Sequence, residues 1–180
     1  MPLNLTKRYS DLLEILHLNE HDRTTSLRGI FNRDIVENQN FRFRTKIIQP
    51  IKSDGEIDLT RLFTHLTTED EIVIDEITGK EIKRRVFECD RSQRLHWIRH
   101  HVEEQKPELL TVFSTEERDI KKRQTIVRTY IYDKEQKYII VLEPQRNNNN
   151  YYLLTAYYLN KPGGSKKISK LLKNKLDNVL

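Results

Sequence analysis

Histidine and arginine side chains are concentrated in one stretch of the chain, DRSQRLHWIRHHVEEQK, residues 90 to 106. It contains Arg91, Arg94, His96, Arg99, His100 and His101. His96 and His100 are four residues apart, so they share one face if the stretch is helical. Such a pair could bind a metal ion, although no third ligand is obviously placed to complete the site. It could also perform acid–base catalysis on a phosphodiester, or be a pair of surface groups on a basic helix.

A second group of polar side chains lies on two stretches that alternate like β-strands, TIVRTYIYD (125–133) and YYLLTAYYL (151–159). Alternation places Arg128 and Tyr130 on one face of the first strand. On the second it places Thr155 and Tyr157 together. The small Ala156 then points to the opposite face, where a helix could pack closely. We therefore expect Thr155 and Tyr157 to face an open side or a cleft.

An imidazole, a guanidinium and a hydroxyl around one phosphate would suit the cleavage of RNA. RNA carries its own nucleophile, the 2′-OH. The protein need only remove that proton, protonate the leaving oxygen and stabilise the charged intermediate. Arg128 could bind the phosphate oxygens with its planar fork, and Thr155 or Tyr157 could add hydrogen bonds. This chemistry requires neither a metal nor a cofactor. The alternative is that Arg128 forms a structural ion pair and the tyrosines only pack.

Other catalytic signatures are absent from the sequence. It contains no GxxxxGK(S/T) phosphate loop, no glycine-rich dinucleotide fingerprint, no GxSxG elbow and no HExxH motif. Its single cysteine, Cys89, excludes an intramolecular disulfide and a cysteine-based zinc site. No stretch approaches the roughly 18 apolar residues that a membrane-spanning helix needs, and the N-terminus lacks an apolar signal region. We therefore expect a cytoplasmic protein with no membrane partner.

The positive charge of the chain lies almost entirely at its C-terminal end. The net charge is +5, and residues 161 to 180 contain six lysines and one aspartate. Lysines of this segment could bind RNA phosphates without sequence specificity. The candidate substrate-binding residues are Lys161, Lys166 and Lys167, together with Arg99 and Tyr130. The alternative is a solvated helix that keeps the protein soluble.

These side chains must be positioned by an α+β fold. The patterns predict helices at 6–18, 23–37, 59–66, 90–106 and 168–180, a strand at 41–47, a hairpin at 67–83 turning at Thr78-Gly79, and three strands at 125–133, 137–144 and 151–159. The short links between the last three strands, one of them an asparagine-rich loop at 145–150, favour an antiparallel meander. We expect a nuclease-like domain at 84–180, in which a helix packs on an antiparallel sheet and a basic helix ends the chain. Residues 1–83 are expected to form a helical and hairpin extension of unknown role.

The order of these elements resembles a known family. A helix with RLHWIRHHV, a charged linker, and strands with VRTYIY, YIIVLEP and LLTAYYL are similar to the barnase–EndoU–colicin–RelE-like nucleases, including their phage and toxin branches, over about residues 90–160. The resemblance implies a helix packed on a four-stranded antiparallel sheet and metal-independent cleavage of RNA. It makes His96 the acid–base group, Arg128 the phosphate ligand and Thr155 the hydroxyl contact. Tyr157 and Lys161 are secondary candidates, and His100 is an alternative to His96.

Two functions remain open from the sequence. The first is a toxin-like endoribonuclease that releases a 2′,3′-cyclic phosphate and has an antitoxin or immunity protein as its partner. The second is a non-catalytic component of a toxin–antitoxin or phage-defence system that binds nucleic acid or protein. Trp97 and the doubled His100-His101 stand where the family more often ends its helix with His-Pro, so the register of the catalytic histidine is open.

Overall fold

The computed structural model describes residues 3–53, 55–119, 123–145 and 150–180. Its α-helices are α1 (Glu20–Phe31), α2 (Leu59–Thr67), α3 (Cys89–Ser92), α4 (Trp97–Val102) and α5 (Gly164–Lys173), with a π-helical turn at Asn32–Val36 and 3-10 turns at Leu3–Thr6 and Pro107–Leu109. Its strands are β1 (Arg42–Phe43), β2 (Lys46–Pro50), β3 (Lys52–Ser53), β4 (Glu56–Ile57), β5 (Thr68–Ile74), β6 (Glu81–Phe87), β7 (Leu110–Asp119), β8 (Gln124–Asp133), β9 (Tyr138–Pro144) and β10 (Tyr151–Tyr158). The expected α+β class is confirmed.

A six-stranded sheet organises the fold, in the order β1-β2-β10-β9-β8-β7. Strands β8 to β10 form the antiparallel meander of three strands that the sequence predicts, and β7 extends it as an antiparallel neighbour of β8. Strand β7 was not expected, because its second half is charged and typical of a linker, but these residues pair with β8 as far as Asp119. Strand β2 joins in parallel beside β10, so the sheet is mixed. Most of the asparagine-rich loop, 146–149, lies outside the described residues.

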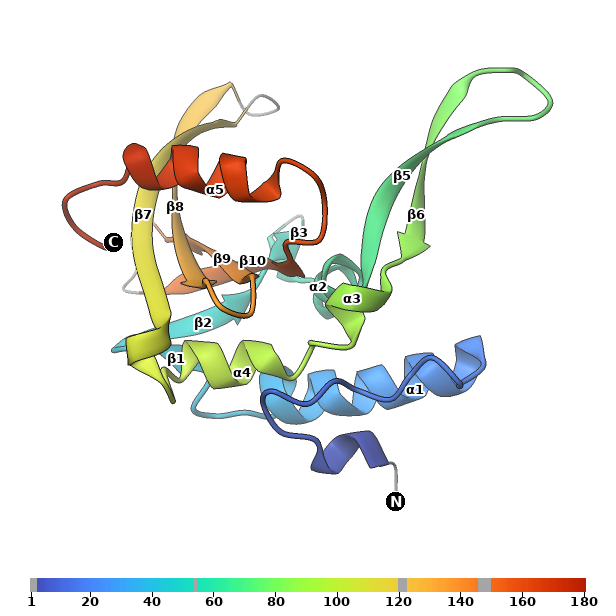
Figure 1. Cartoon of the computed structure of the whole chain (residues 1–180), viewed down its shortest axis with the longest axis horizontal. Helices are drawn as coiled ribbons and strands as arrows, with labels where there is room; N and C mark the ends of the chain where they lie inside the picture. Colours follow the sequence, from blue (N-terminus) through green and yellow to red (C-terminus); the bar gives the residue numbers. More distant parts are fainter. Residues whose placement is uncertain (1–2, 54, 120–122, 146–149) are drawn as a thin grey trace.

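Helices cover the two faces of the sheet (Figure 1). Helices α1 and α4 lie on one face, over a core that includes Trp97, Ile140 and Ala156. Helix α5 lies on the other face, where Ile168 packs with Tyr130 and other side chains of the meander. The first core also contains residues of the N-terminal segment (residues 3–19), of the α1 region (α1 with the π-helical turn that follows it) and of α2. Residues 1–83 and 84–180 therefore contribute to one core and, through β2 and β10, to one sheet.

The N-terminal segment departs from the expected helix at 6–18. The 3-10 turn ends at Thr6, and residues 7–19 form neither an α-helix nor a strand. The segment instead runs along the α3–α4 region. The amide of Leu13 donates to the Gln93 carbonyl over 3.0 Å, and the Trp97 indole donates to the Asp11 carbonyl, also over 3.0 Å. Leu13 and Ile15 are fully buried. These tertiary contacts outweigh the local helical spacing.

The expected helix at 90–106 is divided in two. Helix α3 ends at Ser92 and α4 begins at Trp97, with a turn between them. The expected hairpin before them is confirmed and longer than expected: β5 and β6 form a two-stranded ribbon that projects from the body (Figure 1). In its turn, the Asp75 carboxylate accepts hydrogen bonds from the amide and hydroxyl of Thr78. No helix in the described part of the chain is long and apolar enough to cross a membrane.

Candidate functional site

A cavity of about 510 Å³ opens on the face of the sheet that carries α5, and we refer to it as the sheet cavity. Its walls come from the meander, from the chain around β3 and from helices α2 and α5. The lining residues are Ile51, Lys52, Arg61, His65, Asp119, Arg128, Tyr130, Val141, Glu143, Tyr152, Leu154, Thr155, Tyr157 and Lys167. Cationic and hydroxyl-bearing side chains predominate among the polar ones, so the cavity suits an anionic ligand.

The structure brings together four of the residues that the sequence proposes: Arg128, Tyr130, Thr155 and Tyr157 all line the sheet cavity. Arg128 and Tyr130 both face the cavity because alternate residues of β8 share one face of the sheet. Thr155 and Tyr157 face the cavity because Ala156, between them, points into the core on the opposite face, as expected.

A β-bulge adds to this arrangement. The pairing of β10 with β9 shifts between Leu153 and Thr155, which leaves Leu154 as an extra residue. Bulges redirect side chains and interrupt the hydrogen-bond ladder. Leu154 and Thr155 therefore both line the cavity, although strict alternation would place them on opposite faces.

The imidazole of the cavity comes from α2, not from the histidine-rich stretch. Helix α2 is amphipathic, with Leu62, Phe63 and Leu66 buried. Its polar face carries Arg61 and His65, which are four residues apart and both line the cavity. The short α2 therefore presents a cation and a titratable ring to the same space.

His65 is held in the form that a general base needs. Burial lowers its pKa, and the positive charges of Arg85 and Arg61 lower it further. A hydrogen bond to the backbone of Leu154 acts in the opposite direction, and Asp70 also raises the pKa slightly. A bond that raises a histidine pKa is one in which the ring donates. Because burial and the two arginine charges prevail and the pKa is lowered, the ring is neutral near pH 7, and a neutral imidazole has one nitrogen whose lone pair can accept a proton.

Arg91 fixes the end of α2 that carries His65. Its Nη1 donates to the carbonyl oxygens of His65 and Thr68, each over 2.7 Å. These are carbonyls at the C-terminal end of a helix, where the helix itself supplies no donor. The guanidinium also lies over the ring of Tyr157, 5.9 Å from the ring centre. Arg91 thus connects α3, α2 and β10 beside the cavity.

Glu117 orders the two cavity side chains of β8. Its carboxylate accepts a hydrogen bond from the Tyr130 hydroxyl and pairs with Arg128 Nη1 over 3.3 Å. The Nε atom of Arg128 is buried and has no partner among the described residues. Arg128 is therefore held in place and retains donor capacity. Burial raises the pKa of Tyr157, and Glu117 raises it further, so that phenol keeps its proton.

The histidines of the 90–106 stretch lie elsewhere. His96, His100 and Arg99 line a different pocket, of about 600 Å³, together with residues of the N-terminal segment and of the α1 region. Helix α4 packs on the opposite face of the sheet from α5 (Figure 1). The expected meeting of His96 with Arg128 and Thr155 therefore does not occur, because the sheet separates them. His100 and Arg99 are displaced from the sheet cavity for the same reason.

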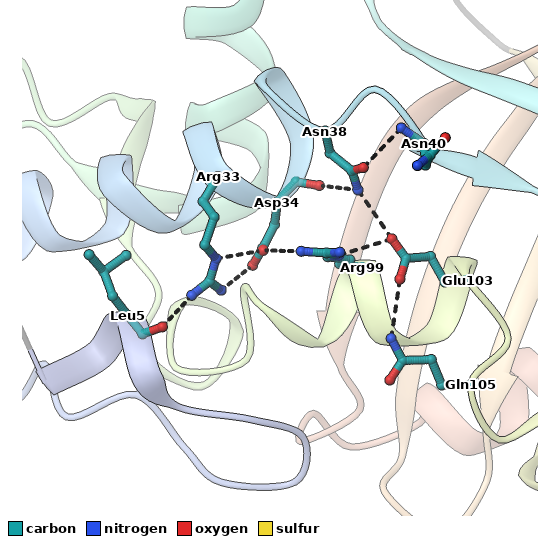
Figure 2. Close-up of polar contacts among 8 residues, drawn as sticks. All are labelled: Leu5, Arg33, Asp34, Asn38, Asn40, Arg99, Glu103 and Gln105. Atoms are coloured by element: carbon teal, nitrogen blue, oxygen red, sulfur yellow. Dashed lines mark hydrogen bonds and ion pairs between the residues drawn. The ribbon is translucent and has the colours of Figure 1, made fainter.

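Structural contacts hold these side chains, although the buried Nδ1 of His96 and Nε2 of His100 have no hydrogen-bond partner among the described residues. The His96 ring is 5% exposed, and its Nε2 lies 3.3 Å from the Arg8 carbonyl. The His100 ring stacks on Tyr9, with ring centres 4.0 Å apart. Arg99 pairs with Glu103 over 2.9 Å and with Asp34 over 3.6 Å, in a network that joins α4 to the α1 region (Figure 2).

The arginine network continues into the N-terminal segment. Asp34 also binds Arg33, which donates to the Leu5 carbonyl, and Glu103 extends the network to Asn38 and Gln105 (Figure 2). Across the described part of the chain, no cluster of three or more His, Cys, Asp or Glu side chains could hold a metal ion. The His96–His100 pair therefore acquires no third protein ligand there.

The three candidate lysines are divided among different positions on and beside α5. Lys167 lines the sheet cavity. Lys161 lies outside it, in an ion pair with Glu69 at the base of the hairpin. Lys166 is exposed on the first turn of α5 and does not line the sheet cavity. Of the basic segment, Lys167 alone belongs directly to the cavity.

His65, Arg61 and Arg91 are the residues that sequence reasoning missed. The sequence does carry a signal for the first two. In LTRLFTHL (59–66), an arginine and a histidine stand four residues apart, opposite a continuous apolar face. That pattern was weaker than the three histidines of the 90–106 stretch, and nothing local shows that α2 would contact β10.

Comparisons with protein-family models, with curated proteins and with solved structures find no significant match. The chemistry of the site is therefore inferred from the residues of this chain alone.

Proposed function

We propose that the chain is a metal-independent endoribonuclease whose active site is the sheet cavity. The observation that carries the proposal is the convergence of His65, Arg128 and Thr155 on one cavity, with Tyr157 and Lys167 beside them. These groups match the needs of phosphodiester cleavage by the 2′-OH of RNA. The proposal keeps the activity that the family resemblance implies and assigns the imidazole to His65 in place of His96.

Each residue then has a defined role. The lone pair of His65 accepts the 2′-OH proton as the 2′-oxygen attacks phosphorus. Arg128 binds the non-bridging oxygens, and the Thr155 hydroxyl donates a further hydrogen bond as charge develops. The protonated phenol of Tyr157 supplies the proton that the leaving 5′-oxygen takes up. The P–O5′ bond breaks as the P–O2′ bond forms, which gives a 2′,3′-cyclic phosphate and a 5′-OH.

The electrostatics of the cavity support an RNA ligand. Lys52, Arg61, Arg128 and Lys167 line it, against Asp119 and Glu143. The excess of positive side chains favours a polyanion and increases the rate at which it associates. Glu117 offsets part of the charge of Arg128, but it also fixes the position of that guanidinium.

The experiment is cleavage of single-stranded RNA by the purified chain in EDTA, with analysis of the new ends for 2′,3′-cyclic phosphate. We expect His65→Gln and Arg128→Gln each to lower the rate by roughly 100-fold or more. Arg128→Lys keeps the charge but loses the fork, and should also be strongly impaired. His96→Gln is the matched control and should retain activity, with folding of every variant checked by circular dichroism.

The outcomes separate the competing functions. Loss of activity in His96→Gln with full activity in His65→Gln would contradict the assignment of the site. Intact RNA that is nevertheless retained by the wild-type chain would favour a nucleic-acid-binding component over an enzyme. A toxin role, with an antitoxin or immunity protein as partner, predicts that expression of the wild-type chain in the cytoplasm stops growth and that His65→Gln relieves the arrest.

A further inference from the structure

A second hollow, of about 290 Å³, adjoins the sheet cavity, and we refer to it as the side hollow. Its lining residues are Glu69, Glu88, Arg91, Tyr157, Tyr158, Leu159, Asn160, Lys161, Gly164 and Lys167. Tyr157 and Lys167 line both spaces. The two spaces are thus neighbours that share these two side chains as a common wall. A ligand in the sheet cavity therefore has the side hollow directly beside it.

The side hollow carries three cations and two carboxylates. Arg91, Lys161 and Lys167 are the cations. Glu69 pairs with Lys161, and Glu88 accepts a hydrogen bond from the backbone amide of Arg91. The Nε atom of Arg91 is buried and has no partner in the described part of the chain. One positive charge therefore remains without a carboxylate in the hollow itself.

The start of α5 adds to this preference for an anion. Gly163, just before the helix, has a φ of 84°, a left-handed conformation that favours glycine. No side chain caps the first turn of α5, and no acidic residue lies in it. Gly164 lines the hollow, next to the cations described above. The partial positive charge of the helix start therefore has the same sign as its neighbours.

We infer that the side hollow binds the nucleotide next to the one that is cleaved, with its phosphate at Lys161 and Lys167. This inference rests on the proposed ribonuclease function and defines its substrate as single-stranded RNA that carries a second phosphate. The shared Tyr157 ring offers a surface against which a base can stack. Glu69 and Glu88 offer acceptors for sugar hydroxyl or base amino groups.

The arrangement favours unpaired RNA at the point of cleavage. Side chains of the sheet and of α5 line both spaces, with α2 added in the sheet cavity and the hairpin base in the side hollow. A base reaches such a concave site most readily when it has left the helical stack. Lys161, at the margin of the hollow, is then a specificity-determining residue. It acts on extended substrates and has no role in the chemical step.

The test compares three substrates with the wild-type chain. The minimal substrate is the dinucleoside monophosphate UpA, which has one phosphate, the 2′-OH and a 5′-oxygen leaving group. The two extended substrates keep that leaving group and add a phosphate at the 5′ end of the uridine or at the 3′ end of the adenosine. We expect one of the two extensions to raise kcat/KM by roughly 10-fold, which is the scale of one phosphate contact.

The variants identify the site of that gain. Lys161→Gln should abolish the gain from the extension and leave turnover of the minimal substrate unchanged, whereas Lys166→Gln, on the exposed side of α5, should alter neither. For a longer RNA, the salt dependence of log kcat/KM should become shallower by about 0.7 in Lys161→Gln, since one phosphate contact is lost. If neither extension helps, or if Lys161→Gln keeps the gain, the inference is wrong while the ribonuclease stands. If no substrate is cleaved, the proposed function itself fails.

Discussion

The hydroxyl of Tyr9 donates a hydrogen bond to Oδ2 of Asp133 over 2.6 Å, and this bond joins the N-terminal segment to the last residue of β8. The same oxygen lies 3.1 Å from Nε2 of His101, whose Nδ1 lies 2.7 Å from the Trp97 carbonyl. His101 and Asp133 are each 1% exposed. Three segments that are distant in the sequence therefore meet at one buried carboxylate.

Removal of the Tyr9 hydroxyl should destabilise the fold. A hydrogen bond to a charged group contributes about 1.5–3 kcal/mol. We expect Tyr9→Phe to lower the free energy of unfolding by about that amount in chemical denaturation. Tyr132→Phe is the control, because the Tyr132 hydroxyl has no hydrogen-bond partner among the described residues. A Tyr9→Phe variant as stable as the Tyr132→Phe variant would show that the N-terminal segment is not held by this bond.

Asp133 should make stability depend on acid pH. Burial alone raises its pKa, but hydrogen bonds from His101, from the backbone amide of Gln136 and from Tyr9 outweigh it and lower the pKa to about 2. A carboxylate with a depressed pKa stabilises the folded state fully above its ordinary pKa of 3.8, and that stability is lost as pH falls towards 2. The loss amounts to roughly 2 kcal/mol. Unfolding measured between pH 5 and 2 should show it, and Asp133→Asn should flatten the curve in that range.

The sequence predicted the meander and the faces of its side chains because strand alternation is a local property. Arg128, Tyr130 and Tyr157 could therefore be assigned to one side of the sheet from the order of residues along each strand. The bulge at Leu154 could not be predicted, since it is a shift of pairing between two strands. The long-range pairing of β2 with β10 was missed for the same reason.

The expected meeting of His96 with Arg128 and Thr155 failed for a physical reason as well. His96 stands in a stretch with a strong helical pattern, but the pattern does not say which face of the sheet that helix covers. The buried side chain of Trp97 and the tertiary hydrogen bonds to residues 7–19 place α4 on the far face. His65 reaches the cavity through α2, which contacts β10 although the two are about 90 residues apart in sequence.

Arg91 should act as a positioning residue for His65. Arg91→Lys keeps the positive charge, but the lysine side chain is one bond shorter and does not bring its nitrogen to the position of Nη1, the single atom that donates to both the His65 and the Thr68 carbonyl. A small displacement of a catalytic group can reduce the rate by roughly 100-fold. We expect kcat to fall by roughly 10- to 100-fold with little change in KM. Arg94→Lys, on the same stretch but bonded to the Asp90 carbonyl, should keep its kcat; an equal loss in both variants would indicate general destabilisation.

The pH profile of RNA cleavage should report the environment of His65. Because burial and the charges of Arg85 and Arg61 lower its pKa, the imidazole stays unprotonated below its ordinary pKa of 6.5. A general base is active when unprotonated, so kcat/KM should rise with pH to a plateau through a midpoint below 6.5. Arg85→Gln removes one of the charges that lower the pKa, and the midpoint should therefore move to higher pH.

The matched control for that shift is Arg84→Gln on the same strand. In the register of the hairpin, Arg84 lies opposite Glu71 and Arg85 lies opposite Asp70. Because Arg84 and Arg85 are consecutive on one strand, their side chains point to opposite faces of the ribbon. Asp70, which raises the pKa of His65, binds Lys83 over 2.6 Å and Arg85 over 3.0 Å, so Arg85→Gln leaves that carboxylate with one cation fewer and shifts the midpoint in the same direction. Arg84→Gln should leave the profile in place. A profile that moves equally in both variants, or in neither, would mean that the group titrating in catalysis is not His65.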